Sequence, residues 1–309
     1  MCVIARSKNL LGPYEPCPHN PILTNIGKNL PIKAIGHADF LEDQTGKWWA
    51  VALGNRPLGY PFRHNMGRET MLVSVQWDEN GWPTVGEKGT VLPTMETEST
   101  LTLFQPSKYI PGVNVSDHFN GDVLHPSWNY IYMPLDDCIS LIGKSLQLRG
   151  NAVKLSEDKP KAWLGRRQEH FFFSAEAEFY FSPTQNEEEV GLSIYMNPGH
   201  HYEIVMTRLN DENCVIVRRR IGSLSAVEAK IPIDTERFSL RIDGDQEWYR
   251  FFYAPYEGKM KQIGMGEAAY LTTEVGGCLT GNYIALFSSG NGKDCVDIAE
   301  VTRFDYTAR

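Results

Sequence analysis

Three short stretches near the N-terminus carry residues that can contact a polar ligand: GHADF at 36–40, GNRP at 54–57 and GRET at 67–70. His37 stands between a glycine and an alanine, so its imidazole can approach a ligand without crowding. Arg68 has five donors in a planar fork, which can hold two adjacent hydroxyl groups or a carboxylate. Both residues also have a purely structural interpretation. His37 can be a hydrogen-bonded residue within the fold, and Arg68 can form an ion pair with Glu69 or Asp39 that holds strand ends together.

Most carboxylates in this region fall in turn-like sequences rather than beside the candidate contacts. The segments EDQTGK and DENG contain four of them: Glu42, Asp43, Asp78 and Glu79. Such sequences favour exposed turns. Asp39 shares a face with His37 if both lie on a regular strand, so it can support the imidazole. A ligand can also stack on strand tryptophans, although these are more often core residues; the candidates are Trp48, Trp49, Trp77 and Trp82.

The remaining motifs do not support a metal or cofactor site. The adjacent histidines of NPGHHY at 197–202 face opposite sides of a strand and do not readily share one metal ion. GNGKD at 290–294 lacks the spacing and the following helix of a phosphate-binding loop. A Gly-x-Ser-x-Gly elbow and a Cys–His nucleophile arrangement are both absent from the sequence. We therefore predict no metal ion and no organic cofactor.

Composition excludes several classes of partner. The chain has 309 residues, 42% of them hydrophobic, which allows a sizeable core. A formal net charge of −8 without basic blocks argues against nucleic acid. The longest apolar runs, such as IALF at 284–287, are too short to cross a bilayer, so no membrane partner is predicted. The six cysteines lack paired spacing, which predicts free thiols. The cellular location stays open, because a longer parent could carry a signal.

Short runs with a period of two predict an all-β protein. Nine segments have this pattern: 48–54, 70–77, 170–181, 191–196, 202–208, 214–220, 238–243, 248–254 and 282–289. After about residue 140 they follow one another at the spacing expected of a β-sandwich. Residues 86–135 are rich in Thr, Ser and Pro and show little alternation. We therefore predict an N-terminal β unit over 1–115, a linker or wrapping segment over 116–139 and a sandwich over 140–309.

Several segments resemble glycoside hydrolase family 43 of the β-xylosidase and α-L-arabinofuranosidase type. The N-terminal segments ARSKNLLGPYEPCPHNPILTN, GHADFLEDQTGKWWAVALGNRP and MGRETMLVSVQWDENGWPTV resemble the last blades of its propeller. LGRRQEHFFFSAEAEFYFSP and EEEVGLSIYMNPGHHYEIVMTR resemble its C-terminal concanavalin-like domain. The resemblance implies a partial five-bladed β-propeller, represented by its last blades in residues 1–115, followed by a concanavalin-like β-sandwich.

The same resemblance implies roles for individual residues. His37 matches a histidine near the floor of the family's pocket, and Arg68 matches the arginine that contacts hydroxyls of the sugar to be cleaved. Glu69 matches a position that we interpret as a support for Arg68. The family projects an aromatic residue from a Phe-Thr-Gly stretch toward the pocket. Leu279 of GGCLTGNY stands at that place here, which predicts a differently shaped substrate pocket.

Family members invert the anomeric centre with a carboxylate base and a carboxylic acid on opposite faces of the sugar, and a third carboxylate tunes the acid. These three groups come from earlier blades, upstream of the matched segments. We therefore expect a fragment that binds a pentose-containing oligosaccharide but lacks the acid and the base and is inactive alone. The choice between xylose and arabinose stays open, because the walls that discriminate them belong mostly to those earlier blades.

Two other hypotheses stay open. The first is a non-catalytic carbohydrate-binding β-sandwich protein, with strand aromatics such as Tyr202, Trp248 and Tyr249 as its platform. The second is an interaction protein whose open propeller edges pair with another chain. Unpaired strand edges are templates for association, so self-association is expected of the fragment as well.

Overall fold

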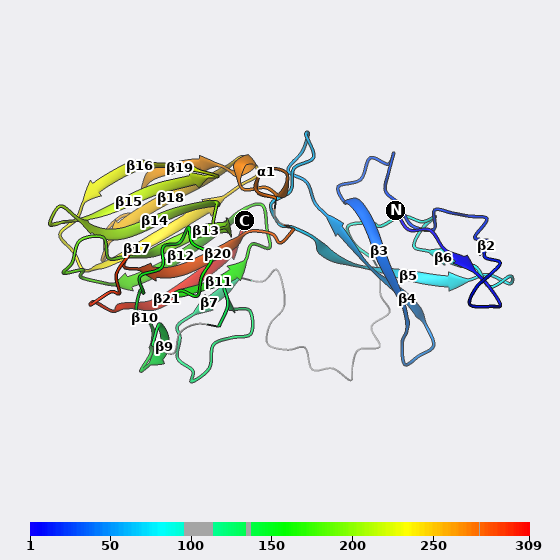
Figure 1. Ribbon diagram of the computed structural model, residues 1–309, viewed down its shortest axis with the longest axis horizontal. Coiled ribbons are helices and arrows are strands. Elements are labelled where there is room, and N and C mark those ends of the chain that lie inside the picture. Colours follow the sequence, from blue (N-terminus) through cyan, green and yellow to red (C-terminus); the bar gives the residue numbers. More distant parts are fainter. Residues whose placement is uncertain (96–113, 134–136, 278) are drawn as a thin grey trace. The chain divides into compact units, whose positions relative to one another are not determined.

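The computed structural model describes residues 1–95, 114–133, 137–277 and 279–309. The chain divides into two compact units, Met1–Gln105 and Pro106–Arg309, and each is described by itself. Strands form almost all of the regular structure in both units, which confirms the all-β prediction (Figure 1). The helical elements of the described residues are the single turns η1 (Ala268–Tyr270) and α1 (Thr273–Gly276).

The N-terminal unit is built on one antiparallel sheet of four strands in sequence order. These strands are β3 (Lys33–Glu42), β4 (Trp48–Asn55), β5 (Glu69–Trp77) and β6 (Pro83–Val85). A separate two-stranded ribbon pairs β1 (Ala5–Arg6) with β2 (Glu15–Pro16). Burial alternates along β4, where Ala50 and Ala52 face the core. The core of the unit also contains Leu23, Ile32, Ile35, Val73, Val75, Trp82 and Val85.

Aspartates reverse the chain at two of the hairpins in this sheet. Between β3 and β4, one carboxylate oxygen of Asp43 accepts hydrogen bonds from the backbone N–H groups of Thr45 and Lys47. Between β5 and β6, Asp78 accepts from the N–H groups of Asn80 and Trp82. An aspartate side chain can close such a turn because its oxygen reaches the N–H groups two and four residues on. The prediction that both aspartates are turn residues is confirmed.

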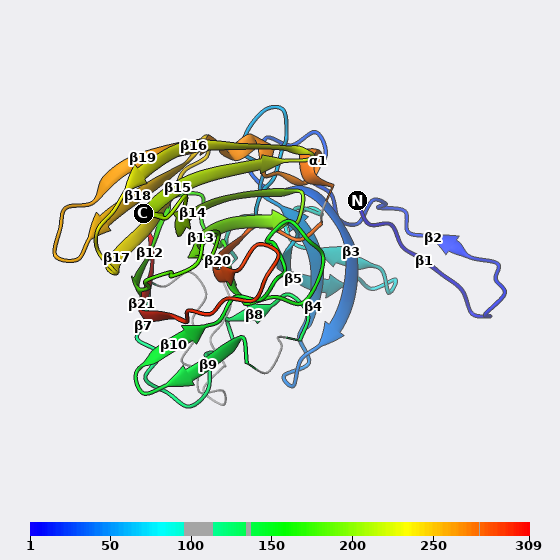
Figure 2. The same ribbon diagram turned by 60° about the vertical axis from the view of Figure 1, so that its left-hand side comes forward.

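The second unit is a sandwich of two antiparallel sheets, which lie over one another in both views (Figure 1 and Figure 2). The sheet that we call the front sheet has seven strands in the order β16 (Leu224–Pro232), β15 (Glu212–Ile221), β14 (His200–Leu209), β13 (Glu189–Asn197), β20 (Tyr283–Ser289), β11 (Trp163–Arg167) and β8 (Asn129–Tyr130). The back sheet has the order β19 (Lys261–Glu267), β18 (Trp248–Pro255), β17 (Arg237–Gly244), β12 (Phe173–Tyr180), β21 (Ala299–Ala308), β10 (Ser145–Leu148) and β9 (Ile139–Ile142), and β7 (Val115–Asp117) also pairs with β21.

The two sheets differ in how their faces are covered. Strand β12 of the back sheet alternates between buried and partly exposed residues, so one face meets the core and the other faces solvent. Strand β13 is buried along almost its whole length. Its outer face belongs to a second apolar cluster that includes Leu155, Trp163 and Ile216. The central strands of the front sheet are therefore covered on both faces, whereas β16 at its edge is mostly exposed. Polar groups on the covered outer face need partners within the protein.

The segment predicted as a linker or wrapping segment contributes two short strands to the sandwich. Strand β7 pairs with β21, where Ser116 lies opposite Asp305. Strand β8 pairs with β11, where Tyr130 lies opposite Leu164. The described part of 116–139 thus wraps onto both sheets. The contact boundary between the units falls at residue 105, before this segment.

Gly191 provides a test of how closely the front sheet is packed. A Cβ atom built on Gly191 lies 2.0 Å from the backbone oxygen of Ile204 on the neighbouring strand. We expect Gly191→Ala to lower the free energy of unfolding of the sandwich by about 2 kcal/mol or more, because backbone rather than a flexible side chain must move. Ser193 is the control: its buried hydroxyl has no partner among the described residues, so Ser193→Ala removes no hydrogen bond. Urea unfolding followed by circular dichroism measures both, and equal destabilisation by the two variants would contradict the packing argument.

Candidate functional site

His37 lies in an irregular part of β3. Gly36 is opposite Leu53 on β4 and Asp39 is opposite Val51, so three steps on β3 match two steps on β4. This is a β-bulge, and His37 within it has φ of 52°. Positive φ is uncommon for residues other than glycine, and such conformations cluster at functional sites. The bulge presents the imidazole at the surface, where His37 is exposed.

Asp39 is exposed like His37, whereas Ala38 between them packs against the core of the unit. The two side chains therefore lie on the solvent side of β3. The carboxylate of Asp39 is exposed to solvent, and its supporting role for the imidazole stays a prediction.

Glu69 is held by a different arginine from the one that the sequence suggested. Nε of Arg56 lies 2.9 Å from Oε2 of Glu69, and Nη2 lies 2.8 Å from Oε1. This two-point ion pair joins the end of β4 to the start of β5 and closes the intervening loop at its base. Nη2 of Arg56 also contacts the sulfur of Met66 at 3.5 Å. The sequence suggests that Glu69 supports Arg68, but the geometry makes it the anchor of Arg56, the arginine of GNRP.

Arg68 is displayed by the closed loop. It is exposed, between the buried residue Gly67, whose φ is 70°, and the anchored Glu69. His64 and Asn65 earlier in the loop are buried, and Nδ1 of His64 lies 3.4 Å from the amide nitrogen of Asn55. Buried contacts on one side and the ion pair at the base hold the backbone of this loop, so the position from which the Arg68 side chain projects is fixed. The planar guanidinium of Arg68 can face solvent.

The register of the sheet separates His37 from Arg68. Gly36 is opposite Leu53, and Leu53 is opposite Thr70, so these three residues form one row across β3, β4 and β5. His37 follows Gly36 on β3, whereas Arg68 comes two residues before Thr70 and just before β5 begins, so the two lie on opposite sides of this row. They are separated by two strand spacings, about 10 Å, across the sheet and by roughly three residues, about 10 Å, along it.

The other sites suggested by the sequence have different surroundings. Leu279 is 53% exposed and lies in the sandwich unit between α1 and β20. Tyr202 and Tyr249 are completely buried, and their hydroxyls bond to the carbonyl of Glu267 and to Gln168. The aromatic platform of Tyr202, Trp248 and Tyr249 is therefore wrong, because two of its three rings belong to the core between the sheets.

The tryptophans of the N-terminal sheet are engaged within the protein. The indole N–H of Trp49 donates to Asp43, and Trp82 is buried beneath the guanidinium of Arg6 at 3.9 Å. Trp48 and Trp77 make an edge contact with ring centroids 5.3 Å apart. The core interpretation is therefore supported for Trp82 and for Trp48, which packs against the core, whereas Trp77 is 41% exposed.

Comparison with known proteins decides the family. The glycosyl hydrolases family 43 profile matches residues 1–83, and the beta xylosidase C-terminal concanavalin A-like domain matches residues 116–307. The chain belongs to glycoside hydrolase family 43. The predicted resemblance is thereby confirmed.

Similar proteins of family 43 include xylosidases and arabinofuranosidases. The chain is 34% identical over 310 residues to the non-reducing end alpha-L-arabinofuranosidase BoGH43B of Bacteroides ovatus, covering 98% of this chain and 57% of that protein. It is 29% identical over 307 residues to a xylosidase/arabinosidase of Butyrivibrio fibrisolvens, covering 97% and 58%. The GH43B structure from the Bacteroides ovatus xyloglucan locus superposes with a TM-score of 0.89 at 31% identity, covering 99% and 60%. The family 43 chain thus spans less than two thirds of these relatives.

Several carboxylates of the N-terminal unit make ion pairs or hydrogen bonds that stabilise the fold. Glu69 is anchored to Arg56, Asp78 closes a turn, and Glu15 pairs with Arg6 at 3.2 Å. Hydrogen bonds from the side chains of Thr45 and Trp49 hold the pKa of Asp43 well below its usual value, which keeps that carboxylate ionised.

No group of three or more His, Cys, Asp or Glu residues within the described ranges is arranged to hold a metal ion. None of the helices in the described part of this family 43 chain is long and apolar enough to span a membrane.

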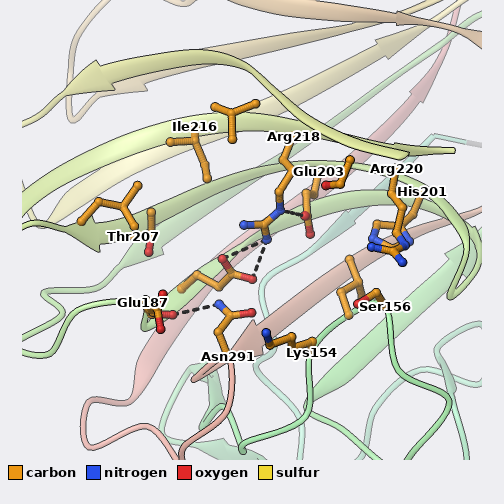
Figure 3. A pocket seen from close by; sticks show the side chains of 15 residues that line it. Lys154, Ser156, Glu187, His201, Glu203, Thr207, Ile216, Arg218, Arg220 and Asn291 are labelled. Atoms are coloured by element: carbon orange, nitrogen blue, oxygen red, sulfur yellow. Dashed lines mark hydrogen bonds and ion pairs between the residues drawn. The ribbon is translucent and has the colours of Figure 1, made fainter. Parts of the chain in front are cut away.

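One polar cluster was missed by sequence reasoning. On the outer face of the front sheet, Nη2 of Arg218 lies 2.9 and 3.0 Å from the two carboxylate oxygens of Glu189, and its Nε donates to Glu203 (Figure 3). Both glutamates are about 1% exposed. Burial raises the pKa of Glu189, and the positive charge of Arg218 opposes that rise. The available signal was alternation: Glu189, Glu203 and Arg218 occupy the same face of three adjacent strands.

His201 lies beside this cluster and is almost completely buried. Its Nδ1 lies 3.3 Å from the carbonyl oxygen of Asn197, and its ring stacks on Tyr195. Burial lowers the pKa of His201 to about 3, and the charges of Arg218, Arg220 and Lys161 add to the effect. The imidazole is therefore neutral in the folded protein at every pH at which the protein is ordinarily studied.

The Arg56–Glu69 pair predicts a difference between neighbouring residues. We expect Glu69→Gln to lower the free energy of unfolding of the N-terminal unit by about 1 kcal/mol, because the pair is two-pointed and only partly exposed. Arg68→Ala should change it by less than about 0.5 kcal/mol, since Arg68 is exposed. Denaturation followed by tryptophan fluorescence measures both. If Arg56→Gln and Glu69→Gln add without coupling in a double-mutant cycle, the pair does not stabilise the loop.

His201 predicts a pH dependence of stability. Its folded pKa lies below the unfolded value of 6.5, so unfolded chains bind the proton more readily. The stability due to neutral His201 is fully present above pH 6.5 and is lost as the pH falls toward 3. Relative to His201→Asn, the wild type should lose up to about 1.4 kcal/mol more per pH unit in that window. Urea unfolding at several pH values measures this, and identical slopes would show that His201 does not titrate as described.

Proposed function

We propose that this chain supplies the sugar-holding portion of an inverting glycosidase that releases pentose units from xylo- or arabino-oligosaccharides. The single observation that carries the proposal is the presentation of Arg68: an exposed guanidinium on a loop that the Arg56–Glu69 pair closes, within the region matched by family 43. A planar fork carried by a loop that is closed at its base suits two neighbouring hydroxyls of a sugar ring.

His37 and Asp39 complete the proposed contact surface. The bulge in β3 exposes both side chains, and the strained backbone at His37 is a cost to the fold that a binding role explains. In this proposal the imidazole contacts a substrate hydroxyl, and Asp39 orients it. Glu69 contributes indirectly, because it holds Arg56 and thereby the loop that carries Arg68.

The acid and the base of the reaction are assigned to polypeptide outside this chain. Inversion needs two carboxyl groups about 6.5–9.5 Å apart on opposite faces of the sugar. Within the described N-terminal residues, Glu15, Asp43, Glu69 and Asp78 are bound to structural partners. Glu42, Glu79 and Glu87 are exposed at or beside turns. Asp39 is the carboxylate beside the proposed contact surface, and one group cannot act on both faces at once. We therefore propose that the chain alone is inactive.

The four-stranded antiparallel sheet β3–β4–β5–β6 has the strand number and order of one propeller blade. We propose that it is one of the last blades of a five-bladed propeller, whose other blades supply the acid and the base. Leu279, exposed on the sandwich, is proposed as an apolar contact for the substrate, in a position where the family has an aromatic ring. Self-association through the free edge of β3 is a further consequence, measurable by sedimentation at several protein concentrations.

A chimera tests the assignment of Arg68. In it, this chain replaces the matching portion of the Bacteroides ovatus arabinofuranosidase, which supplies the remaining polypeptide. We expect the chimera to release pentose from a 4-nitrophenyl α-L-arabinofuranoside or β-D-xyloside and the 309-residue chain to release none. Arg68→Ala in the chimera should lower kcat/KM on the order of 100-fold if its contacts strengthen in the transition state.

Two results would contradict the proposal. Steady pentose release by the purified 309-residue chain would place a complete acid–base pair within it. A loss of less than about threefold in the Arg68→Ala chimera would make the arginine part of the scaffold. Arg68→Lys is the matched control: it keeps the charge and loses the fork, so an intermediate loss is expected.

A further inference from the structure

A cavity of about 330 Å³ lies on the outer face of the front sheet, within the sandwich unit. Its floor consists of side chains from β13, β14 and β15, including Glu189, Glu203 and Thr207. Lys154 and Glu187 lie at its exposed rim. Lys154 belongs to the segment around Leu155 that covers this face, which we call the covering segment. Figure 3 shows Arg218 at the centre, between Thr207 on one side and His201 with Arg220 on the other. The volume falls within the range of small-molecule sites.

Three polar atoms at this cavity have no hydrogen-bond partner among the residues that the structure describes. They are Oε2 of Glu203, Oγ1 of Thr207 and Nε of Arg220. Glu203 and Thr207 are each only about 1% exposed. Buried polar groups are normally paired, and an orphaned one costs free energy. These three atoms therefore hold no hydrogen bond that a ligand's hydroxyl would have to displace.

The charges around the cavity are balanced. Three cationic side chains line it: Lys154, Arg218 and Arg220. Three acidic side chains line it as well: Glu187, Glu189 and Glu203. His201 contributes no charge, since burial keeps it neutral. A charged ligand would give this partly buried site a net charge, whereas a neutral ligand leaves the positive and negative side chains balanced. The unpartnered atoms include both an acceptor and a donor, which hydroxyl groups satisfy equally well.

The cavity is held in shape without a ligand. Glu189 and Glu203 fix the guanidinium of Arg218 from two sides. The buried ammonium of Lys161 donates to the carbonyl oxygens of Lys154 and Leu155 at 3.2 and 3.1 Å and so fastens the covering segment at the rim. Preorganised groups lower the entropy lost on binding. Among the lining residues, Ile216 and Val227 offer apolar surface to the C–H groups of a ring.

We propose that this cavity binds a neutral polyhydroxylated ligand of mono- or disaccharide size. The ligand's hydroxyls donate to Glu203, exchange hydrogen bonds with Thr207 and accept from Arg220. This site is on the sandwich, uses none of the residues assigned to glycoside hydrolysis, and does not depend on the proposed function. It gives the sandwich a carbohydrate contact of its own, formed by charged and hydroxyl side chains instead of the aromatic platform suggested by the sequence.

The test uses the full 309-residue chain with xylobiose and L-arabinose as neutral probes, and D-glucuronate and D-glucosamine as charged ones. Backbone amide shifts of β14 and β15 in NMR spectra locate binding, and calorimetry gives the affinity. We expect a neutral probe to bind with Kd on the order of 1 mM, and the charged probes at least tenfold more weakly. No shift of these amides at probe concentrations well above that Kd overturns the proposal, as does equal binding of neutral and charged probes.

Variants test whether the ligand occupies this cavity. Thr207→Val removes a hydroxyl that has no partner in the described part of the chain, so the protein should stay folded while binding weakens by about threefold to tenfold. Val227→Trp places a large ring at the exposed rim and should abolish binding, whereas Val123→Trp, at an exposed valine outside the cavity, should not. Arg68→Ala should also leave binding unchanged, which separates this site from the proposed glycosidase contacts. Unaltered affinity in Val227→Trp would overturn the proposal.

Discussion

Coverage of the central strands of the front sheet on both faces is the constraint on which the sandwich depends. A strand with one solvated face can carry charges freely, but β13 and β14 are buried almost throughout. A carboxylate on such a strand loses its hydration and needs a cation within reach. Arg218 meets this need for Glu189 and Glu203 at once, since its fork has donors on two edges. The polar cluster is thus a consequence of the covering of this face by the segment around Leu155.

The same physical problem is solved differently in the N-terminal unit. There the sheet has an exposed face, and the paired charges stand at the base of a loop. The Arg56–Glu69 pair joins β4 to β5 and limits the conformations of the loop that presents Arg68, so in the proposed function its contribution to binding is indirect. A bulge does similar work in β3, where an extra residue turns His37 outward. Both devices expose a polar side chain on or next to the sheet, in a position that would suit recognition of hydroxyl groups.

The two units therefore recognise polar ligands by different means in these proposals. The N-terminal unit offers exposed donors that need further polypeptide to become an active site. The sandwich offers a partly open, charge-balanced cavity formed by its own residues. Family 43 membership accounts for the first, since the matched relatives are xylosidases and arabinofuranosidases of greater length. The second follows from the burial and pairing of Glu189, Glu203, Thr207 and Arg218 alone.

The sequence by itself determined the all-β class, the main strands, the aspartate turns at 43 and 78 and the family, because each depends on residues close together in the chain. Period-two alternation and turn chemistry are local signals. Only the tertiary structure decided that Glu69 binds Arg56, that His37 lies in a bulge, and that Tyr202 and Tyr249 are buried. The reason is that partner choice and burial depend on strand register and on which segment covers which face. Both properties join residues that are distant in the chain, and no local pattern encodes them.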